Sequence, residues 1–269
     1  MDAVSPVAEY EEVGSLFRPA LLSAAEVATI NDDLDRIVAD SESPGLVLEK
    51  DGRTLRSVFN PHLYSDVLHR LVRHPKVLGA VDELLGEPVY VFQLVVNNKA
   101  PFNGDVWYWH QDYPTYRADD HIPECRMVNA LIYLDEVTQF NGPLMVVPGS
   151  HRMASEWPDE STQGTSYKIR YSATGVIEAE VQRGGIDAPT GPAGSAMFMH
   201  PNLLHASGSN LSPWRRRLIS LTYNALSNKA TAPTTRAREI VPDDSTVSAL
   251  EALGDDCLLA GAAPSHQHV

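Results

Sequence analysis

The chain has 269 residues, of which 43% are hydrophobic and 21% charged, as in an ordinary soluble globular protein. Its 35 acidic and 21 basic residues give a net charge of −14, which argues against nucleic acid and anionic membrane surfaces as partners. No apolar run is long enough to span a bilayer, the first residues do not resemble a secretory signal, and Cys125 and Cys257 form no metal-like or redox-like cluster. We therefore expect a single domain over residues 1–269 in the cytoplasm.

The first third of the chain has the pattern of helices that pack against a sheet. Ser23 and Glu26 form a capping-box pattern, in which each side chain satisfies a free amide of the first helical turn. A second helical stretch runs from about Ser65, restarts at Pro75 and ends at Gly86. The apolar positions that recur at helical spacing in the first helix are Val27, Ile30, Leu34 and Val38.

From Pro88 onward the pattern changes to short strands rich in β-branched and aromatic residues, separated by turn signals. Because no helices are interleaved, the pattern predicts a sandwich or jelly roll and no parallel α/β sheet. Residues 152–192 are polar and rich in glycine, which predicts a long insertion or lid loop, and the tail has no clear core pattern. The candidate strands are residues 89–96, 106–109, 127–134, 144–147, 195–199 and 218–223. The predicted fold is mainly β with flanking helices, arranged as N-terminal helices (about 20–86), a core (about 88–226) and a C-terminal tail (227–269).

Two histidines and one aspartate have the residue types and order of a metal site. His110 and Asp112 are two residues apart just after a strand-like run, so on a strand both side chains would point to one face. A third ligand should come from a distant strand, and His205 follows the strand-like segment 195–199. Two histidines and a carboxylate on one face of an octahedron leave open positions, as in non-haem iron(II) oxygenases. Taken alone, a His-x-Asp pair is equally compatible with a surface ion pair or a core histidine.

A run of three arginines follows the third candidate ligand. Residues 215–217 lie ten to twelve positions after His205, where a hairpin partner strand would carry them. A planar guanidinium binds a carboxylate bidentately and stays charged when it is buried. The run could therefore supply the residue that holds the distal carboxylate of 2-oxoglutarate, or it could simply be a solvated strand edge.

The motifs together resemble the phytanoyl-CoA dioxygenase superfamily over roughly residues 46–226. The similarity is greatest to the bacterial branch that contains proline trans-4-hydroxylase and ectoine hydroxylase, and residues 48–54 and 71–75 resemble the proline hydroxylase in particular. The residues that carry the resemblance are Gln93-Leu-Val-Val-Asn97-Asn-Lys99, Trp109-His110-Gln111-Asp112-Tyr113, Asn141-Gly142-Pro143-Leu144, Pro148-Gly149-Ser150-His151, and His205-Ala-Ser207 followed by Arg216.

The resemblance implies a double-stranded β-helix (jelly-roll, cupin-like) core and an iron(II) site with 2-oxoglutarate and O2 as cosubstrates. Its iron ligands would be His110, Asp112 and His205. The arginine that binds 2-oxoglutarate in this family lies eleven residues after the second histidine, which selects Arg216, and strand alternation separates Arg216 from its two neighbours. The other residues implied in cosubstrate binding are Ser207, Lys99 and Asn129, and Gln93 matches a substrate-contacting position.

The segment after the His-x-Asp motif departs from the family pattern. Tyr116 replaces a tryptophan, and His121-Ile122 replaces Gly-Met, in a loop expected beside the open iron face. Together with Tyr113, Tyr116 is therefore a candidate substrate-binding residue in a remodelled pocket. The implied substrate is a small molecule: a cyclic amino acid, a cyclic dipeptide or another amino-acid-like or peptide-derived metabolite, in specialised, natural-product metabolism.

Other functions remain open beside hydroxylation. The same iron chemistry could desaturate or cyclise a substrate, or the chain could be a plain L-proline 4-hydroxylase. An iron halogenase would carry glycine or alanine in place of Asp112. A metal-free jelly-roll binding protein would not need three ligands plus Arg216, and a zinc hydrolase would not explain the arginine.

The remaining histidines and the tryptophans beside the motif have structural interpretations. His151 fits a turn residue, and His200 is expected on the strand face opposite His205. His266 and His268 lie in a tail where chance explains them. Trp107 and Trp109 alternate with His110, so both are expected to pack outward.

Overall fold

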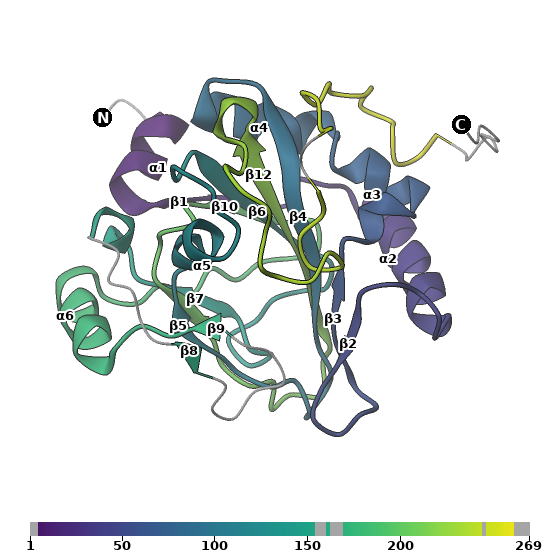
Figure 1. The fold of residues 1–269 in the computed structure, drawn as a ribbon. Coiled ribbons are helices and arrows are strands. Elements are labelled where there is room, and N and C mark those ends of the chain that lie inside the picture. Colours follow the sequence, from purple (N-terminus) through teal and green to yellow (C-terminus); the bar gives the residue numbers. More distant parts are fainter. Residues whose placement is uncertain (1–4, 154–159, 162–168, 244–245, 261–269) are drawn as a thin grey trace.

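The computed structural model describes residues 5–153, 160–161, 169–243 and 246–260. Its core consists of two antiparallel sheets that face each other (Figure 1). The seven-stranded sheet has the order β1 (Ser15–Arg18), β10 (Ala196–Met199), β6 (Met127–Tyr133), β12 (Arg216–Ala225), β4 (Val89–Lys99), β3 (Leu55–Phe59) and β2 (Leu46–Leu48). The smaller sheet has the order β5 (Trp107–His110), β11 (His205–Ser207) and β7 (Leu144–Val146). The predicted mainly β fold with a jelly-roll core is confirmed.

Apolar side chains of both sheets meet in the space between them. Leu131 and Met197 of the large sheet pack in one cluster with Val146 of the small sheet. Strand β4 alternates as a strand between two layers should: Leu94 belongs to the core on the helix side, whereas Gln93 lines a cavity on the other side.

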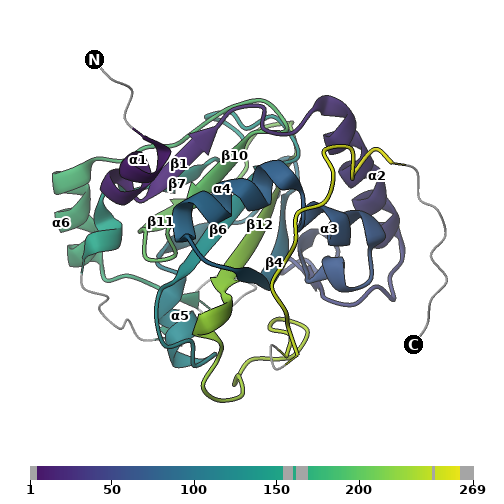
Figure 2. The ribbon, with the colours of Figure 1, turned by 90° about the horizontal axis from the view of Figure 1, so that it is seen from above.

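Helices cover the outer face of the large sheet (Figure 2). They are α2 (Ala24–Ala39), α3 (Asp66–Leu71) and α4 (Pro75–Leu85), and their apolar residues join the same core cluster as β6 and β12. Ser23 and Glu26 form the predicted capping box, and Gly86 ends α4 with a positive φ, so these helix predictions are confirmed. The buried apolar faces of these helices hold the large sheet, whose other face lines the cavity. None of the described helices is long and apolar enough to cross a bilayer.

Several elements were not predicted. Helix α1 (Pro6–Val13), β1 and the hairpin β2–β3 were missed because they are short and lack clear periodicity. Helix α5 (Tyr113–Ala118) replaces the loop expected after the His-x-Asp motif. The remaining short elements are the 3-10 turns η1 (Pro61–Leu63), η2 (Ser150–Arg152) and η3 (Leu226–Asn228).

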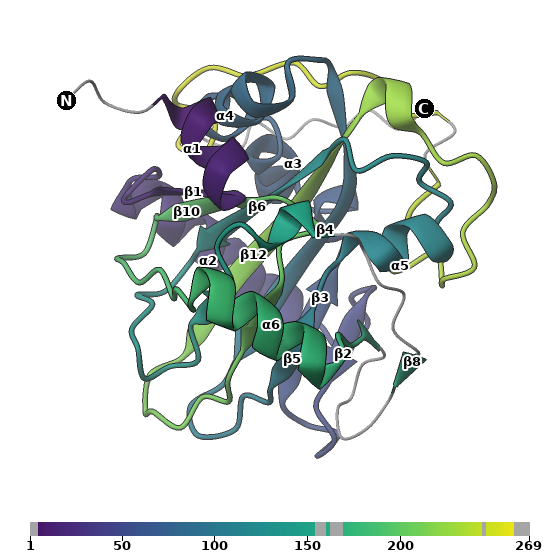
Figure 3. The same cartoon turned by 90° about the vertical axis from the view of Figure 1, so that its left-hand side faces the viewer.

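The predicted insertion at 152–192 is partly structured. It contains β8 (Glu160–Ser161), β9 (Ile169–Arg170) and α6 (Thr174–Gly184), which covers the side of the molecule next to the smaller sheet (Figure 3). Expecting only a loop was wrong for α6, a helix whose single buried residue, Glu180, gives it almost no apolar face to recognise. Residues 154–159 and 162–168 of the predicted loop lie outside the described part.

The C-terminal segment packs on the rest of the chain. Cys257 and Leu258 join the helix-side core, and Val241 joins a cluster with Tyr116. Backbone hydrogen bonds attach the segment further, as from the Leu250 amide to the Val89 carbonyl. The sequence shows no core pattern here because isolated apolar residues in an irregular segment leave no periodic signal.

Candidate metal and cosubstrate site

His110, Asp112 and His205 lie close together where β5 ends and β11 begins in the smaller sheet. His110 ends β5 and pairs directly with His205, the first residue of β11. One ligand atom from each of the three residues lies within 4.8 Å of the others, with Asp112 Oδ1 3.5 Å from His110 Nε2 and 3.7 Å from His205 Nε2. These separations are short enough for one metal ion to bind all three side chains.

The aspartate reaches this point by a route that the sequence did not predict. Strand β5 ends at His110, and Asp112 has helical backbone angles at the start of α5. The two side chains therefore converge because the chain turns into a helix, whereas the prediction relied on the two-residue period of a strand.

Hydrogen bonds orient all three side chains toward one centre. Nδ1 of His110 lies 2.6 Å from the Tyr108 carbonyl, and Nδ1 of His205 lies 2.9 Å from the Leu203 carbonyl. Because a carbonyl only accepts, each Nδ1 carries the hydrogen and each Nε2 keeps its lone pair for a metal. Burial and the neighbouring His110 lower the pKa of His205 to about 4, which keeps that imidazole neutral.

Asn129 supports the aspartate from behind. Its amide donates to Asp112 Oδ2 at 2.7 Å, and its own carbonyl oxygen accepts from the Thr222 hydroxyl at 2.8 Å. The second contact fixes which end of the amide faces the carboxylate. Asp112 Oδ1 is thereby left for a metal, and two imidazoles plus one carboxylate are a donor set that suits iron(II).

Arg216 presents an unsatisfied guanidinium to the same cavity. Its Nη2 donates to the Ser207 hydroxyl and to the Gly142 carbonyl, each at 3.0 Å. Its Nε and Nη1 are buried and have no hydrogen-bond partner among the described residues. Burial lowers the pKa of Arg216 to about 10, which still leaves the group charged at neutral pH. A buried cation with two donors to spare fits a carboxylate ligand.

The neighbouring arginines point away from the cavity. Arg215, just before β12, lies 3.3 Å from Asp135, and Arg217 of β12 lies 2.6 Å from Asp35. The alternation expected from the sequence is therefore present, and Arg216 is the member of the run that lines the cavity.

The cavity has a volume of about 300 Å³, at the lower end of the range for small-molecule sites. The metal triad lines it together with two sets of residues. We call the first the Arg216 set: Trp107, Ser207 and Arg216. We call the second the Arg236 set: Gln93, Tyr116, Asp119, Arg170, Arg236 and Ile240.

The Arg236 set includes residues that sequence reasoning missed. Arg236 contacts Asp120, with Nε 2.9 Å from Oδ1, and its guanidinium lies 5.7 Å from the Tyr116 ring centre. Arg170 of β9 pairs with Asp119 at 2.7 Å. Both arginines come from segments predicted to be a loop or a tail without core pattern, so no signal singled them out.

Side-chain amides bind the backbone of the C-terminal segment that contributes Arg236 and Ile240 to the Arg236 set. The Asn60 amide donates to the carbonyls of Glu239 and Ile240 at 2.9 and 3.0 Å, and the Gln93 amide also donates to the Ile240 carbonyl. Gln93, expected to contact substrate, thus lines the cavity and also anchors this segment.

Three of the implied site residues do not line the cavity. Lys99 is buried and donates to the carbonyls of Asp105, Ser207 and Gly208, while burial and the nearby guanidiniums of Arg216 and Arg56 lower its pKa to about 6. Tyr113 is buried, and its hydroxyl lies 3.4 Å from the Ile122 carbonyl. Asn129 acts on Asp112 as described. Direct contact of these three with cosubstrate or substrate stays a prediction.

Trp107 lines the cavity, so the expectation that it packs outward was wrong. In the β5–β11 ladder His205 pairs with His110 but Ser207 pairs with Trp107, so two steps on β11 match three on β5. This β-bulge puts Trp107 and His110 on the same face despite their odd spacing.

The other histidines lie away from the triad where the structure describes them. The ring of His151 packs 5.2 Å from that of His200, and His151 Nε2 lies 3.1 Å from the Glu11 carbonyl. His266 and His268 lie outside the described residues.

Comparison with known proteins agrees with this geometry. A model of the family described as phytanoyl-CoA dioxygenase matches residues 10–218. The chain belongs to the phytanoyl-CoA dioxygenase family. It is 35% identical over 246 residues to an ectoine dioxygenase of Bordetella bronchiseptica, covering 86% of this chain and 79% of the relative. It is also 34% identical over 247 residues to an L-proline trans-4-hydroxylase of Streptomyces griseoviridis, covering 88% and 91%.

Solved structures of the family have the same fold. EctD from S. alaskensis with 2-oxoglutarate and 5-hydroxyectoine superimposes with a TM-score of 0.79 at 30% identity, covering 92% of this chain and 86% of that one. EctD with bound Fe gives a TM-score of 0.78 at 31% identity, covering 92% and 85%.

Proposed function

We propose that this chain hydroxylates an unactivated C–H bond of a small, carboxylate-bearing amino-acid-like metabolite. Its reaction class is that of its family: it is a 2-oxoglutarate-dependent dioxygenase that uses iron. Iron(II) supplies the oxidative chemistry, in which one atom of O2 enters the substrate and the other enters succinate as 2-oxoglutarate loses carbon dioxide.

One observation carries this proposal. A triad of two histidines and one carboxylate, and a buried arginine with two nitrogens that have no partner among the described residues, line the same small cavity. His110, Asp112 and His205 would hold the metal. Arg216, steadied by Ser207, would bind the distal carboxylate of 2-oxoglutarate through Nη1, which has no hydrogen-bond partner among the described residues.

The Arg236 set supports a charged substrate. Arg170 and Arg236 contribute two positively charged guanidiniums to the cavity wall. Asp119 adds a carboxylate, and Gln93 adds an uncharged amide. Such a lining suits a zwitterion and favours a free amino acid, cyclic or not, over a neutral cyclic dipeptide. Tyr116 and its partner Phe92, whose rings lie 5.0 Å apart, add an apolar surface for the carbon skeleton.

A succinate-release screen over amino acids, imino acids, ectoine and cyclic dipeptides tests the proposal, with mass spectrometry of the product. We expect one added oxygen on a carboxylate-bearing amino acid and poor turnover of free L-proline and ectoine. The reason is that α5 departs from the relatives beside the metal, where a shift of about 1 Å can cost on the order of a hundredfold in rate.

The product decides between the alternatives. Efficient, fully coupled turnover of L-proline would make the chain a plain proline 4-hydroxylase, and loss of two hydrogens would mean desaturation or ring closure. Absence of any 2-oxoglutarate-dependent turnover, with metal-free binding of a ligand, would instead favour a jelly-roll binding protein.

Asn129→Ala is expected to weaken iron binding without unfolding the chain. Removing the amide frees Asp112 to rotate, and loss of such an outer partner typically costs about 10–100-fold in metal affinity or activity. The iron concentration for half-maximal activity measures the effect. The matched control is Asn98→Ala on β4, which β12 separates from β6; the Asn98 amide donates to the Leu55 carbonyl. Equal iron requirements for both variants would contradict the role of Asn129.

A further inference from the structure

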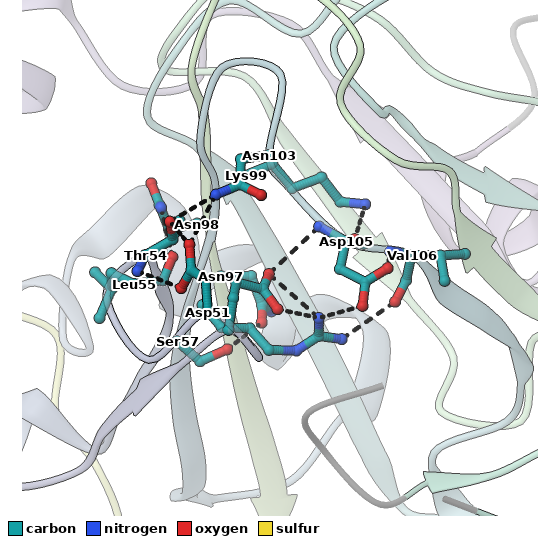
Figure 4. Close-up of polar contacts among 12 residues, drawn as sticks. Asp51, Thr54, Leu55, Ser57, Asn97, Asn98, Lys99, Asn103, Asp105 and Val106 are labelled. Atoms are coloured by element: carbon teal, nitrogen blue, oxygen red, sulfur yellow. Dashed lines mark hydrogen bonds and ion pairs between the residues drawn. The ribbon is translucent and has the colours of Figure 1, made fainter. Parts of the chain in front are cut away.

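Hydrogen bonds join the hairpin between β2 and β3 to the turn that precedes Trp107. Asp51 accepts hydrogen bonds from the backbone amides of Arg53 and Thr54, and the Asn103 amide donates to both Asp51 and Thr54 (Figure 4). These contacts involve residues 48–54, a motif that the metal site and the cavity lining leave unused. The hairpin therefore has a fixed position behind the cavity wall.

A buried ion pair lies at the centre of this junction. Arg56 is 2% exposed, and its Nη1 lies 3.3 and 3.1 Å from the two carboxylate oxygens of Glu49, which is 7% exposed. Its Nη2 donates to the Val106 carbonyl at 3.2 Å, and Glu49 also accepts from the Asp105 amide at 3.3 Å. Both charged groups thus hold the backbone immediately before Trp107.

The guanidinium also lies over the ring of the indole. The central carbon of Arg56 is 4.1 Å from the Trp107 ring centre. A cation at this distance from an aromatic face, shielded from water, is attracted to the ring. Trp107 lines the cavity and pairs across the ladder with Ser207, which in turn holds Arg216. Contacts thus run from Glu49 through Arg56 to the wall beside Arg216.

We propose that Arg56, held by Glu49, is a positioning residue for Trp107, and that it fixes the cavity wall against which the 2-oxoglutarate chain lies. The inference rests on the proposed function for the identity of that ligand. An arginine suits the task better than a lysine because its planar group can stack on the ring while its edge binds a carboxylate and a carbonyl.

A double-mutant cycle tests this role. Arg56→Met is expected to raise the KM for 2-oxoglutarate about tenfold with kcat changed less, since a desolvated cation–π contact is lost. In a Trp107→Leu background the same substitution should change KM less than about twofold, because the group on which Arg56 acts is gone. Arg53→Met, on the exposed tip of the same hairpin, is the control and should leave KM unchanged.

Equal effects of Arg56→Met in both backgrounds, or no effect in either, would overturn the proposal. Because Glu49 would be left buried without its partner, Arg56→Met could unfold; Arg56→Lys and the paired change Glu49→Gln with Arg56→Met then replace it in the cycle. Arg56→Lys keeps the positive charge but removes the planar guanidinium that lies over the Trp107 ring. An unchanged KM in that variant therefore also counts against the proposal.

A fluorescence measurement separates this inference from the proposed function. The emission of Trp107, taken as the difference between the parent and Trp107→Leu, should be quenched by acrylamide about twice as strongly in the Arg56→Lys background as in the wild type. This readout needs no cosubstrate. If the wild type fails to consume 2-oxoglutarate, the proposed function is wrong. Unchanged quenching would by itself refute the role of Arg56 as a positioning residue for Trp107.

Discussion

Arg216→Met is expected to weaken 2-oxoglutarate binding by roughly 30-fold to several thousandfold. Truncating one partner of a buried, hydrogen-bonded charge pair costs about 2–5 kcal/mol, because the carboxylate left behind has neither water nor cation around it. Methionine keeps most of the side-chain volume, so the hydrophobic neighbours Leu131 and Leu218 should stay in place. Titration of the iron-loaded enzyme with 2-oxoglutarate, with kcat measured at saturation, gives the effect.

Arg215→Met is the matched control for this experiment. Arg215 is partly exposed and pairs with Asp135, so its loss should leave the affinity for 2-oxoglutarate within about twofold, as for an ordinary surface ion pair. A larger effect for Arg215 than for Arg216 would show that the cosubstrate binds on the other face of the strand.

Asp112→Ala is expected to abolish retained iron and hydroxylation together. It removes the only anionic ligand of the triad, so the loss should exceed the roughly 10–100-fold cost of removing an outer partner such as Asn129. The iron content after gel filtration and the rate of succinate formation measure the two effects. Asp66→Ala, at an exposed position of α3, is the control.

The Asp112 experiment also separates a folding defect from a metal defect. Asp112 contacts both histidines and Asn129, and within the described part of the chain no arginine or lysine forms an ion pair with it. The variant should therefore keep a cooperative thermal transition. Full iron content and full activity in Asp112→Ala would show that the metal lies elsewhere.

The sequence predicted those parts of the site that lie on regular strands. Gln93, which the family resemblance selected, lines the cavity. Alternation separated Arg216 from Arg217 on β12, because a two-residue period holds wherever a strand is unbroken. The helix caps at Ser23 and Gly86 were also predictable, since capping is a local property of a few residues.

The prediction failed where the backbone leaves that period. Trp107 faces the cavity because a bulge shifts the register of β5, and a bulge of this kind depends on the partner strand β11, nearly a hundred residues away in the chain. Arg236 and Ile240 were missed for a different reason. Their segment is irregular and is held by side chains such as Asn60 through backbone carbonyls, which carry no sequence pattern.

The match to the family ends at residue 218, whereas Arg236, Ala237 and Ile240 line the cavity from beyond that limit. The wall of the cavity is therefore built from two parts of the chain, because Gln93, Tyr116 and Arg170 lie within the matched residues whereas Arg236 and Ile240 lie beyond them. Residues 229–241 contain neither the candidate metal ligands nor Arg216, so they can be substituted without changing those residues. We expect a graft of the corresponding segment between two members of the family to shift their substrate preference. A cut ahead of Arg236 would do more than open the cavity, because it would also remove Cys257 and Leu258 from the core on the helix side.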